Sequence, residues 1–113
     1  MSRWYDSDPM PGLTATTDAT PDGPRVRLAG ELDIATAPQA DEELRHAESG
    51  GPERLTLDLS RLSFMDSTGL RLVVAAEQRA QESGWQLYVT RGPEAVQRVF
   101  ELTGVDERLR FVE

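Results

Sequence analysis

The chain has 113 residues, no cysteine, one histidine and a formal net charge of −8. This length fits a single domain that can bury its own core. The lack of cysteine excludes a disulfide framework, a thiolate metal site and a Cys nucleophile, and the single histidine, His46, excludes a His-rich metal site. Nucleic acids and anionic membranes are bound by clustered Lys and Arg, so the acidic balance argues against both as partners.

No apolar run approaches the roughly 20 residues of a membrane span, and the N-terminus lacks a signal-peptide pattern. We therefore expect a cytoplasmic protein. Residues 1–12 contain two prolines and show no periodicity, which predicts a loose tail. The remaining residues, 13–113, are expected to form the one domain.

The first predicted elements are a β-hairpin and a helix. Residues 13–17 and 25–30 alternate between polar and apolar side chains on either side of the turn signal Pro-Asp-Gly-Pro at 21–24. Thr36 then predicts a helix start, with Gln39 at the capping-box position. The helix is expected to end near residues 46–48 and to bury three residues, Ala40, Leu44 and Ala47.

Three more strands and two more helices follow. Residues 54–59 predict a strand with its leucines on one face, and strands are also expected at 85–90 and 109–112. A helix opens at Gly92-Pro93, carries an apolar stripe of Val96, Val99 and Phe100, and stops at Gly104. The order β-β-α-β-α-β-α-β predicts an α/β fold, a small mixed sheet with a leading hairpin and helices packed on it.

The stretch from Phe64 to Leu70 joins the third strand to a helix predicted over residues 67–83, which Gly84 ends. On a helical wheel, Leu70, Val73, Val74 and Ala80 face the sheet. Glu77 falls on the same arc, and we expect its carboxylate to reach solvent. Leu72 and Ala76 lie opposite, which predicts either a contact patch or merely an exposed leucine.

Asp66-Ser67-Thr68-Gly69 stands at the start of this helix and has three interpretations. Asp, Ser and Thr are preferred helix caps, so the stretch can serve as a cap alone. A nucleophilic Ser67 would depend on His46, but no G-x-S-x-G elbow is present, and joint catalysis by Asp33, Asp58 and Asp66 would need a pocket that the sequence does not indicate. An enzyme is therefore not expected.

The third interpretation is phosphorylation of Ser67. There is no P-loop or G-x-G-x-x-G motif for nucleotide binding. A phosphate at a helix start meets the positive end of the helix dipole and is tolerated there. It would nevertheless be repelled by Asp66 and by a neighbouring Asp33, and it would place charge in any interface around the helix. The stretch can therefore act as a binary switch.

Four blocks of the sequence resemble the STAS domain, and more narrowly the bacterial anti-sigma factor antagonists: Gly30-Glu31-Leu32-Asp33, Leu57-Asp58-Leu59, Phe64-Met65-Asp66-Ser67-Thr68-Gly69-Leu70 and Leu102-Thr103-Gly104-Val105. The resemblance covers residues 13–112. It implies that the phosphorylated serine is Ser67, preceded by the acid Asp66, with Thr68 as a second candidate acceptor. It also implies a switch loop and partner surface made of Asp33, Asp66, Ser67, Thr68, Gly69, Leu72 and Ala76.

The resemblance further implies the partners. One is an anti-sigma factor with GHKL-type serine kinase activity, which the unphosphorylated antagonist binds so that a sigma factor is released for transcription. Phosphorylation ends this binding, and a PP2C-type phosphatase restores it. No cofactor and no metal are implied. The alternatives are a non-switching STAS scaffold subunit of a sensory or lipid-transport complex, and a hydrolase that uses Ser67 with His46.

Overall fold

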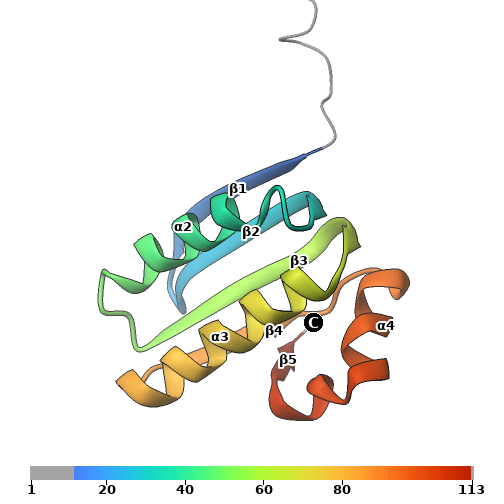
Figure 1. Ribbon diagram of the computed structural model, residues 1–113. Coiled ribbons are helices and arrows are strands. Elements are labelled where there is room, and N and C mark those ends of the chain that lie inside the picture. The colour runs from blue at the N-terminus through green and yellow to red at the C-terminus, as the bar shows by residue number, and fades with distance from the viewer. Residues whose placement is uncertain (1–11, 113) are drawn as a thin grey trace, which may run out of the picture.

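The computed structural model describes residues 12–112, which form a five-stranded sheet with α-helices on one of its faces (Figure 1). The strand order is β1-β2-β3-β4-β5; β1 and β2 are antiparallel and the other pairs are parallel. The expected mixed sheet with a leading hairpin is confirmed. The elements are β1 (Leu13–Thr20), β2 (Gly23–Leu32), α2 (Ala37–Glu48), β3 (Arg54–Met65), α3 (Ser67–Ser83), β4 (Gln86–Thr90), α4 (Glu94–Thr103), the 3₁₀ helix η1 (Val105–Arg108) and β5 (Arg110–Val112).

The third strand is longer than predicted. Its leucines Leu55, Leu57 and Leu59 are fully buried on the helix-covered face, as expected. The strand then continues to Met65 through two register shifts against β2. These irregularities break the simple alternation after Leu59, which is why the pattern predicted an earlier end.

The predicted capping box at the start of α2 is wrong. Thr36 occupies the N-cap position but makes no capping bond. Its hydroxyl donates instead to the carbonyl oxygen of Glu31 at 2.7 Å. The Gln39 amide reaches across to the carbonyl oxygen of Leu13, at 3.1 Å. Both side chains tie the helix to the hairpin, a tertiary role that local sequence does not reveal.

The bounds predicted for the central helix are confirmed, because α3 runs from Ser67 to Ser83 and ends at Gly84 with φ = 81°. The placement of Leu72 and Ala76 on an exposed outer face is wrong. Leu72 is 8% exposed and Ala76 is fully buried, whereas Val74 is only partly buried. The buried arc is therefore turned away from the predicted one.

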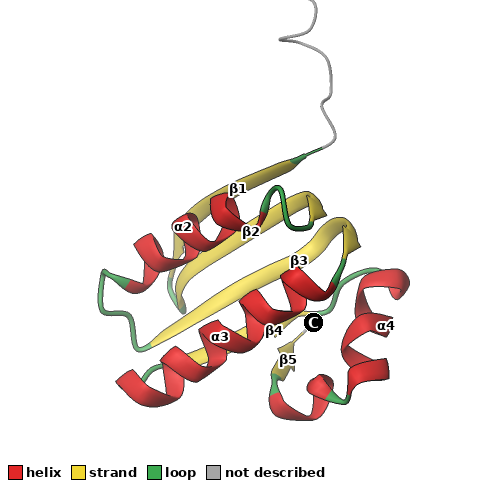
Figure 2. Ribbon diagram, in the orientation of Figure 1, coloured by secondary structure: helices red, strands yellow, loops and turns green. Residues whose placement is uncertain are grey.

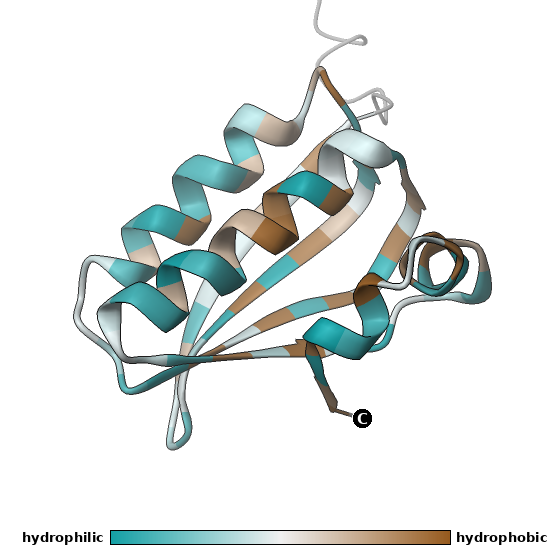
Figure 3. Cartoon of the chain, turned by 60° about the horizontal axis from the view of Figure 1, so that its bottom comes forward, coloured by the Kyte–Doolittle hydropathy of each residue, from teal (hydrophilic) through white to brown (hydrophobic). Residues whose placement is uncertain are grey.

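The cause of this rotation is the neighbouring helix. Figures 1 and 3 both show α2 and α3 side by side over the same face of the sheet. Arg79 of α3 donates two hydrogen bonds to the Glu48 carboxylate of α2, at 2.8 and 2.6 Å. Helix α3 thus packs against two neighbours, the sheet and α2, and the residues that face α2 become buried as well.

Glu77 also departs from expectation. It is 6% exposed, and one carboxylate oxygen accepts a hydrogen bond from the Gln81 amide at 2.9 Å. Its other oxygen, Oε1, has no partner among the described residues. The wheel had placed Glu77 correctly on the sheet-facing arc. The expected access to solvent is wrong because the packing of α3 encloses Glu77 itself.

The C-terminal part of the domain packs as predicted, apart from one short element. Helix α4 buries Val96 and Phe100 completely and ends at Gly104 with φ = 77°. The Phe100 ring meets that of Phe111 in β5 edge-on, with the centroids 5.4 Å apart. The 3₁₀ helix η1, which follows α4 and can be seen with the other helices in Figure 2, was not predicted.

Asp58 is a buried acid on the face of the sheet away from the buried leucines. It is 5% exposed and forms an ion pair with Arg25 at 3.1 Å. One of its oxygens also accepts from the Thr90 hydroxyl at 2.8 Å and from the Ser60 hydroxyl at 2.7 Å. Burial raises the pKa of the Asp58 carboxyl, but hydrogen bonds from Ser60 first, then Thr90 and Arg25, outweigh burial and lower it to about 2.

This network predicts acid sensitivity. The folded-state pKa of Asp58 lies below the ordinary value of 3.8, so the carboxylate stabilises the fold above about pH 4 and loses this contribution as the pH falls towards 2. The loss is expected to be roughly 2 kcal/mol. Urea unfolding of the wild type and of Asp58→Asn between pH 7 and pH 2 measures it. The lowered pKa of Asp58 would be contradicted if the unfolding free energy of the wild type fell no more steeply from pH 4 to pH 2 than that of Asp58→Asn.

Candidate functional site

The predicted switch residues lie at the end of the sheet where parallel strands β2 and β3 finish and helices α2 and α3 begin. The backbone N–H of Asp66 donates to the carbonyl oxygen of Leu32 at 3.3 Å. Because Asp33 directly follows Leu32, the loop after β2 and the junction after β3 are adjacent. The structure therefore brings Asp33, Asp66 and Ser67 to the same end of the sheet.

Asp66 is the N-cap of α3. Its Oδ1 accepts from the backbone N–H of Thr68 at 2.9 Å and of Gly69 at 3.4 Å. Its own carbonyl oxygen accepts from Leu70 N–H at 3.1 Å. The capping interpretation is confirmed, with Asp66 as the residue that caps. Ser67 is consequently the first residue of the helix, and it is exposed.

Asp33 shapes the neighbouring loop. Its Oδ1 accepts from the backbone N–H groups of Ala35 and Thr36, at 3.0 and 3.1 Å. This is an Asx-type turn, in which a short acidic side chain replaces a backbone acceptor. The turn carries Ile34 outwards, so that this side chain is 78% exposed. Asp33 thus has a structural role next to the junction between β3 and α3.

Gly69 allows α3 to approach the sheet closely. A Cβ atom at this position would lie 2.6 Å from Met65 Cγ and 2.8 Å from Leu32 Cγ. A Cβ atom essentially never comes this close to an atom it is not bonded to, so any side chain here would push the helix start away from β2. The missing side chain of Gly69 thus keeps the start of α3 close to β2 and to the end of β3.

A shallow hollow lies between the first turns of α2 and α3. Leu72 and Thr68 line it from α3, together with the exposed Arg71. On the other side it is lined by Ile34, Ala37, Pro38 and Asp41. Leu72 therefore reaches the candidate surface as part of a hollow between two helices, and does not project from an outer face.

Sequence reasoning missed the exposed apolar side chains of this end. Ile34 lies in the loop after β2, and Phe64, which is 47% exposed, lies near the end of β3. Phe64 pairs in register with Glu31, beside the buried pair Leu32 and Met65. In the sequence, Ile34 belongs to no periodic apolar pattern and stands between the end of a strand and the start of a helix. An apolar residue in such a loop was the one feature of the sequence that could have indicated its exposure.

The geometry does not support nucleophilic catalysis by Ser67. His46 lies in the last turn of α2, whereas Ser67 lies near the first turn of that helix. The nine residue steps from Ala37 to His46 span about 14 Å along the helix axis, so His46 lies towards the far end of α2 from the β3–α3 junction. Asp58 is held by its own network in the sheet and does not join Asp33 and Asp66. The single histidine cannot serve as a base for Ser67.

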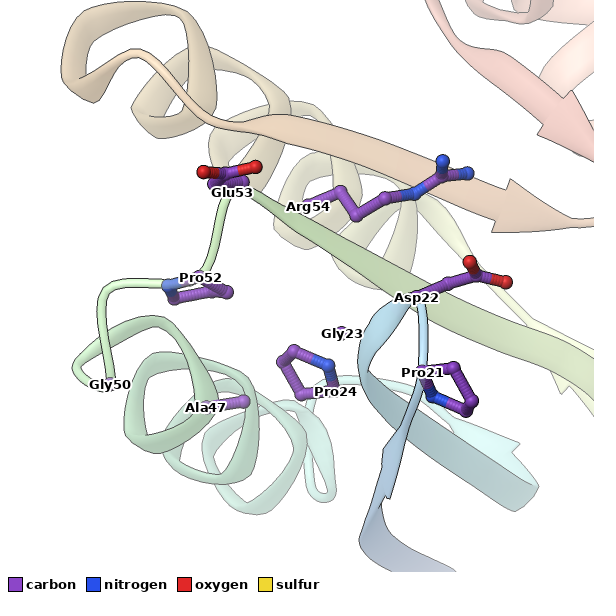
Figure 4. Close-up of a pocket in the computed structure, with 9 residues that line it drawn as sticks. All are labelled: Pro21, Asp22, Gly23, Pro24, Ala47, Gly50, Pro52, Glu53 and Arg54. Carbon is purple, nitrogen blue, oxygen red and sulfur yellow. The ribbon is translucent and has the colours of Figure 1, made fainter.

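A second hollow lies at the opposite end of the sheet, between the β1–β2 turn and the loop before β3 (Figure 4). Figure 4 shows Pro21 and Pro24 from the hairpin and Pro52 from the loop around it. Its ionisable lining side chains are Asp22, Glu53 and Arg54. It contains no hydroxyl, thiol or imidazole, so it offers no counterpart to Ser67.

Comparison with known proteins identifies the class of protein. The sequence model of a family described as "Mlab, STAS domain" matches residues 15–113, and the chain therefore belongs to the STAS domain family. Within residues 12–112, no helix is both long enough and apolar enough to cross a membrane.

The particular branch of the family follows from the relatives. An anti-sigma-B factor antagonist of Staphylococcus aureus (strain NCTC 8325 / PS 47) is 32% identical over 88 residues, which cover 78% of this chain and 82% of the relative. The chain is thus a relative of the anti-sigma factor antagonists, which are regulatory proteins rather than enzymes.

Solved structures agree with this grouping. A crystal structure of an anti-sigma factor antagonist from Mycobacterium paratuberculosis has a TM-score of 0.76 and 26% identity, and the match covers 88% of this chain and 84% of that one. The unphosphorylated antagonist SpoIIAA has a TM-score of 0.73 and 22% identity over 88% of this chain and 89% of its own. SpoIIAA has also been solved in its phosphorylated form, and this structure has a TM-score of 0.67 at 22% identity over 88% of this chain and 92% of that one. At 22% identity these likenesses show a shared fold.

Proposed function

We propose that this protein is an anti-sigma factor antagonist switched by phosphorylation of Ser67. In its unphosphorylated form it binds an anti-sigma factor that is also a GHKL-type serine kinase, and so releases a sigma factor for transcription. The observation that carries this proposal is the exposed Ser67 at the first position of α3, at the end of the fold where β2 and β3 finish and where the apolar side chains of Ile34 and Phe64 are also exposed. The match to named antagonists supports the same partner class.

The switch works through charge in a docking surface. The kinase transfers the γ-phosphoryl group of ATP to Ser67: the bond from Oγ to phosphorus forms, ADP leaves, and the hydroxyl proton passes to a base of the kinase. The product carries about −1.5 to −2 charges beside Asp66 and Asp33. A partner that covers Ile34 and Phe64 would have to desolvate this phosphate, which disfavours the complex. A PP2C-type phosphatase hydrolyses the phosphoserine and restores binding.

The proposed contact surface is built from this end of the fold. It includes Asp33, Asp66, Ser67, Thr68 and the hollow lined by Leu72. Gly69 serves it indirectly, because it sets the position of the helix start. Ala76 is omitted because it is fully buried.

Mass spectrometry of the protein after incubation with the cognate kinase and ATP tests the phosphorylation site. One phosphate is expected on the wild type and on Thr68→Ala, and none on Ser67→Ala. Thr68 is only partly exposed and its backbone is held by the Asp66 cap, so it should be the poorer acceptor. Phosphorylation of Ser67→Ala to the wild-type extent would show that Ser67 is not the acceptor.

A further inference from the structure

Arg71 is the cation closest along α3 to the proposed phosphoserine. It is exposed, as Ser67 is, and follows it by four residues on the same helix. Side chains four residues apart in a helix are neighbours on one face, and their Cβ atoms lie roughly 5–6 Å from each other. Among the described residues, Arg71 forms no salt bridge, whereas Arg45 and Arg98 each pair with an acid one turn earlier on their own helices.

Two of the backbone amides at the start of α3 are already engaged by a carboxylate. Those of Thr68 and Gly69 already donate to Asp66 Oδ1. Several acids lie at this end of the fold: Asp66 itself, Asp33 on the loop after β2, Glu31 near the end of β2, and Asp41 across the hollow on α2. Asp41 is engaged by Arg45 at 2.9 Å. A phosphate on Ser67 would therefore stand at an end of the fold that is rich in carboxylates, with Arg71 as the nearest cation along α3.

We propose that Arg71 is the residue that binds the phosphate of phosphoserine 67, as an i,i+4 ion pair along the outer flank of α3. The guanidinium donates to two phosphate oxygens, a geometry that suits arginine better than lysine. The pair draws the phosphate along the helix towards the hollow lined by Thr68 and Leu72. It thereby stabilises the phosphorylated state against the neighbouring carboxylates and places the phosphate over the proposed contact surface.

This inference rests on phosphorylation of Ser67, but it can be tested without any kinase. Phosphoserine is incorporated at position 67 by genetic encoding, and its second ionisation is followed by ³¹P NMR at low salt. In Arg71→Gln the phosphate pKa is expected to rise by about 0.3 to 0.5 of a pH unit, because the dianion loses its neighbouring cation. Arg71→Lys should recover part of the shift, and 0.5 M salt should reduce it.

Arg98→Gln provides the matched control, since it removes an exposed arginine of the same charge from α4. It should change the phosphate pKa by less than about 0.1 of a pH unit. In the phosphorylated wild type, the Arg71 Nε–H resonance should also shift relative to the unphosphorylated protein. An unchanged phosphate pKa in Arg71→Gln, or an equal change in Arg98→Gln, would overturn the assignment of Arg71.

The two proposals fail separately. If the kinase does not modify Ser67 but the encoded phosphoserine responds to Arg71→Gln, the proposed function is wrong and the ion pair stands. If the kinase modifies Ser67 but the phosphate pKa is unchanged in Arg71→Gln, the proposed switch stands and the assignment of Arg71 is wrong.

Discussion

Replacing Ser67 with Asp is expected to weaken binding to the cognate anti-sigma factor at least tenfold, while Ser67→Ala retains affinity close to that of the wild type. The carboxylate of the Asp variant would directly follow Asp66 in the chain, at the same end of the fold as Asp33 and the exposed Ile34 and Phe64. Desolvating this added charge in such an interface costs more than about 1.4 kcal/mol, which corresponds to a factor of ten. Titration calorimetry with the purified kinase measures the effect.

Asp and phosphoserine differ in charge, so encoded phosphoserine at position 67 should weaken binding further than Ser67→Asp does. Glu82→Gln provides a control for altered surface charge, because Glu82 is exposed near the other end of α3. Tight binding of both Ser67→Asp and the phosphoserine protein would remove the switch. It would favour the alternative of a STAS scaffold whose interface is constant.

Replacing Gly69 with Val is expected to cost about 3 kcal/mol of unfolding free energy and to displace the start of α3. Even the first added carbon would lie 2.6 Å from Met65 Cγ and 2.8 Å from Leu32 Cγ, and both neighbours are buried. The helix must move away from β2, and Asp66 and Ser67 move with it. Gly69→Ala should have the same effect at about half the size, because Ala is also the better helix former. Urea denaturation measures the loss.

Gly50→Ala is the matched control. Its Cβ would approach no atom closer than 3.6 Å, and its φ lies outside the positive range. It should change stability by less than about 0.5 kcal/mol. Folded Gly69→Ala should also be phosphorylated more slowly than Gly50→Ala, because its acceptor is displaced. Equal stability of Gly69→Val and the wild type would contradict the close approach seen here.

Much of the candidate site could be predicted because its geometry is local. A helix cap needs a short acidic or hydroxyl side chain just before an apolar-periodic run, and Asp66 satisfies this from sequence alone. The position of Ser67 follows directly from it. Gly84 and Gly104 likewise end their helices in left-handed conformations that favour glycine.

The surface around Ser67 could not be predicted in the same way. A helical wheel assumes one buried arc, but α3 has two neighbours, so Leu72 and Ala76 turn inwards towards α2. The apolar side chains that remain exposed are instead Ile34 and Phe64, which come from other segments. Their proximity to Ser67 depends on β2 and β3 ending at the same edge.

Local sequence patterns are enough to derive the order of the elements, the extent of α3 and the position of Ser67 at its first turn, because periodicity, caps and glycine stops act between residues close along the chain. The tertiary structure alone decided which face of α3 is buried, that Glu77 is enclosed, and that Asp58 is held by Arg25 and Thr90 from two other strands. These features depend on contacts between residues far apart in sequence, and only the packed fold specifies which of them meet.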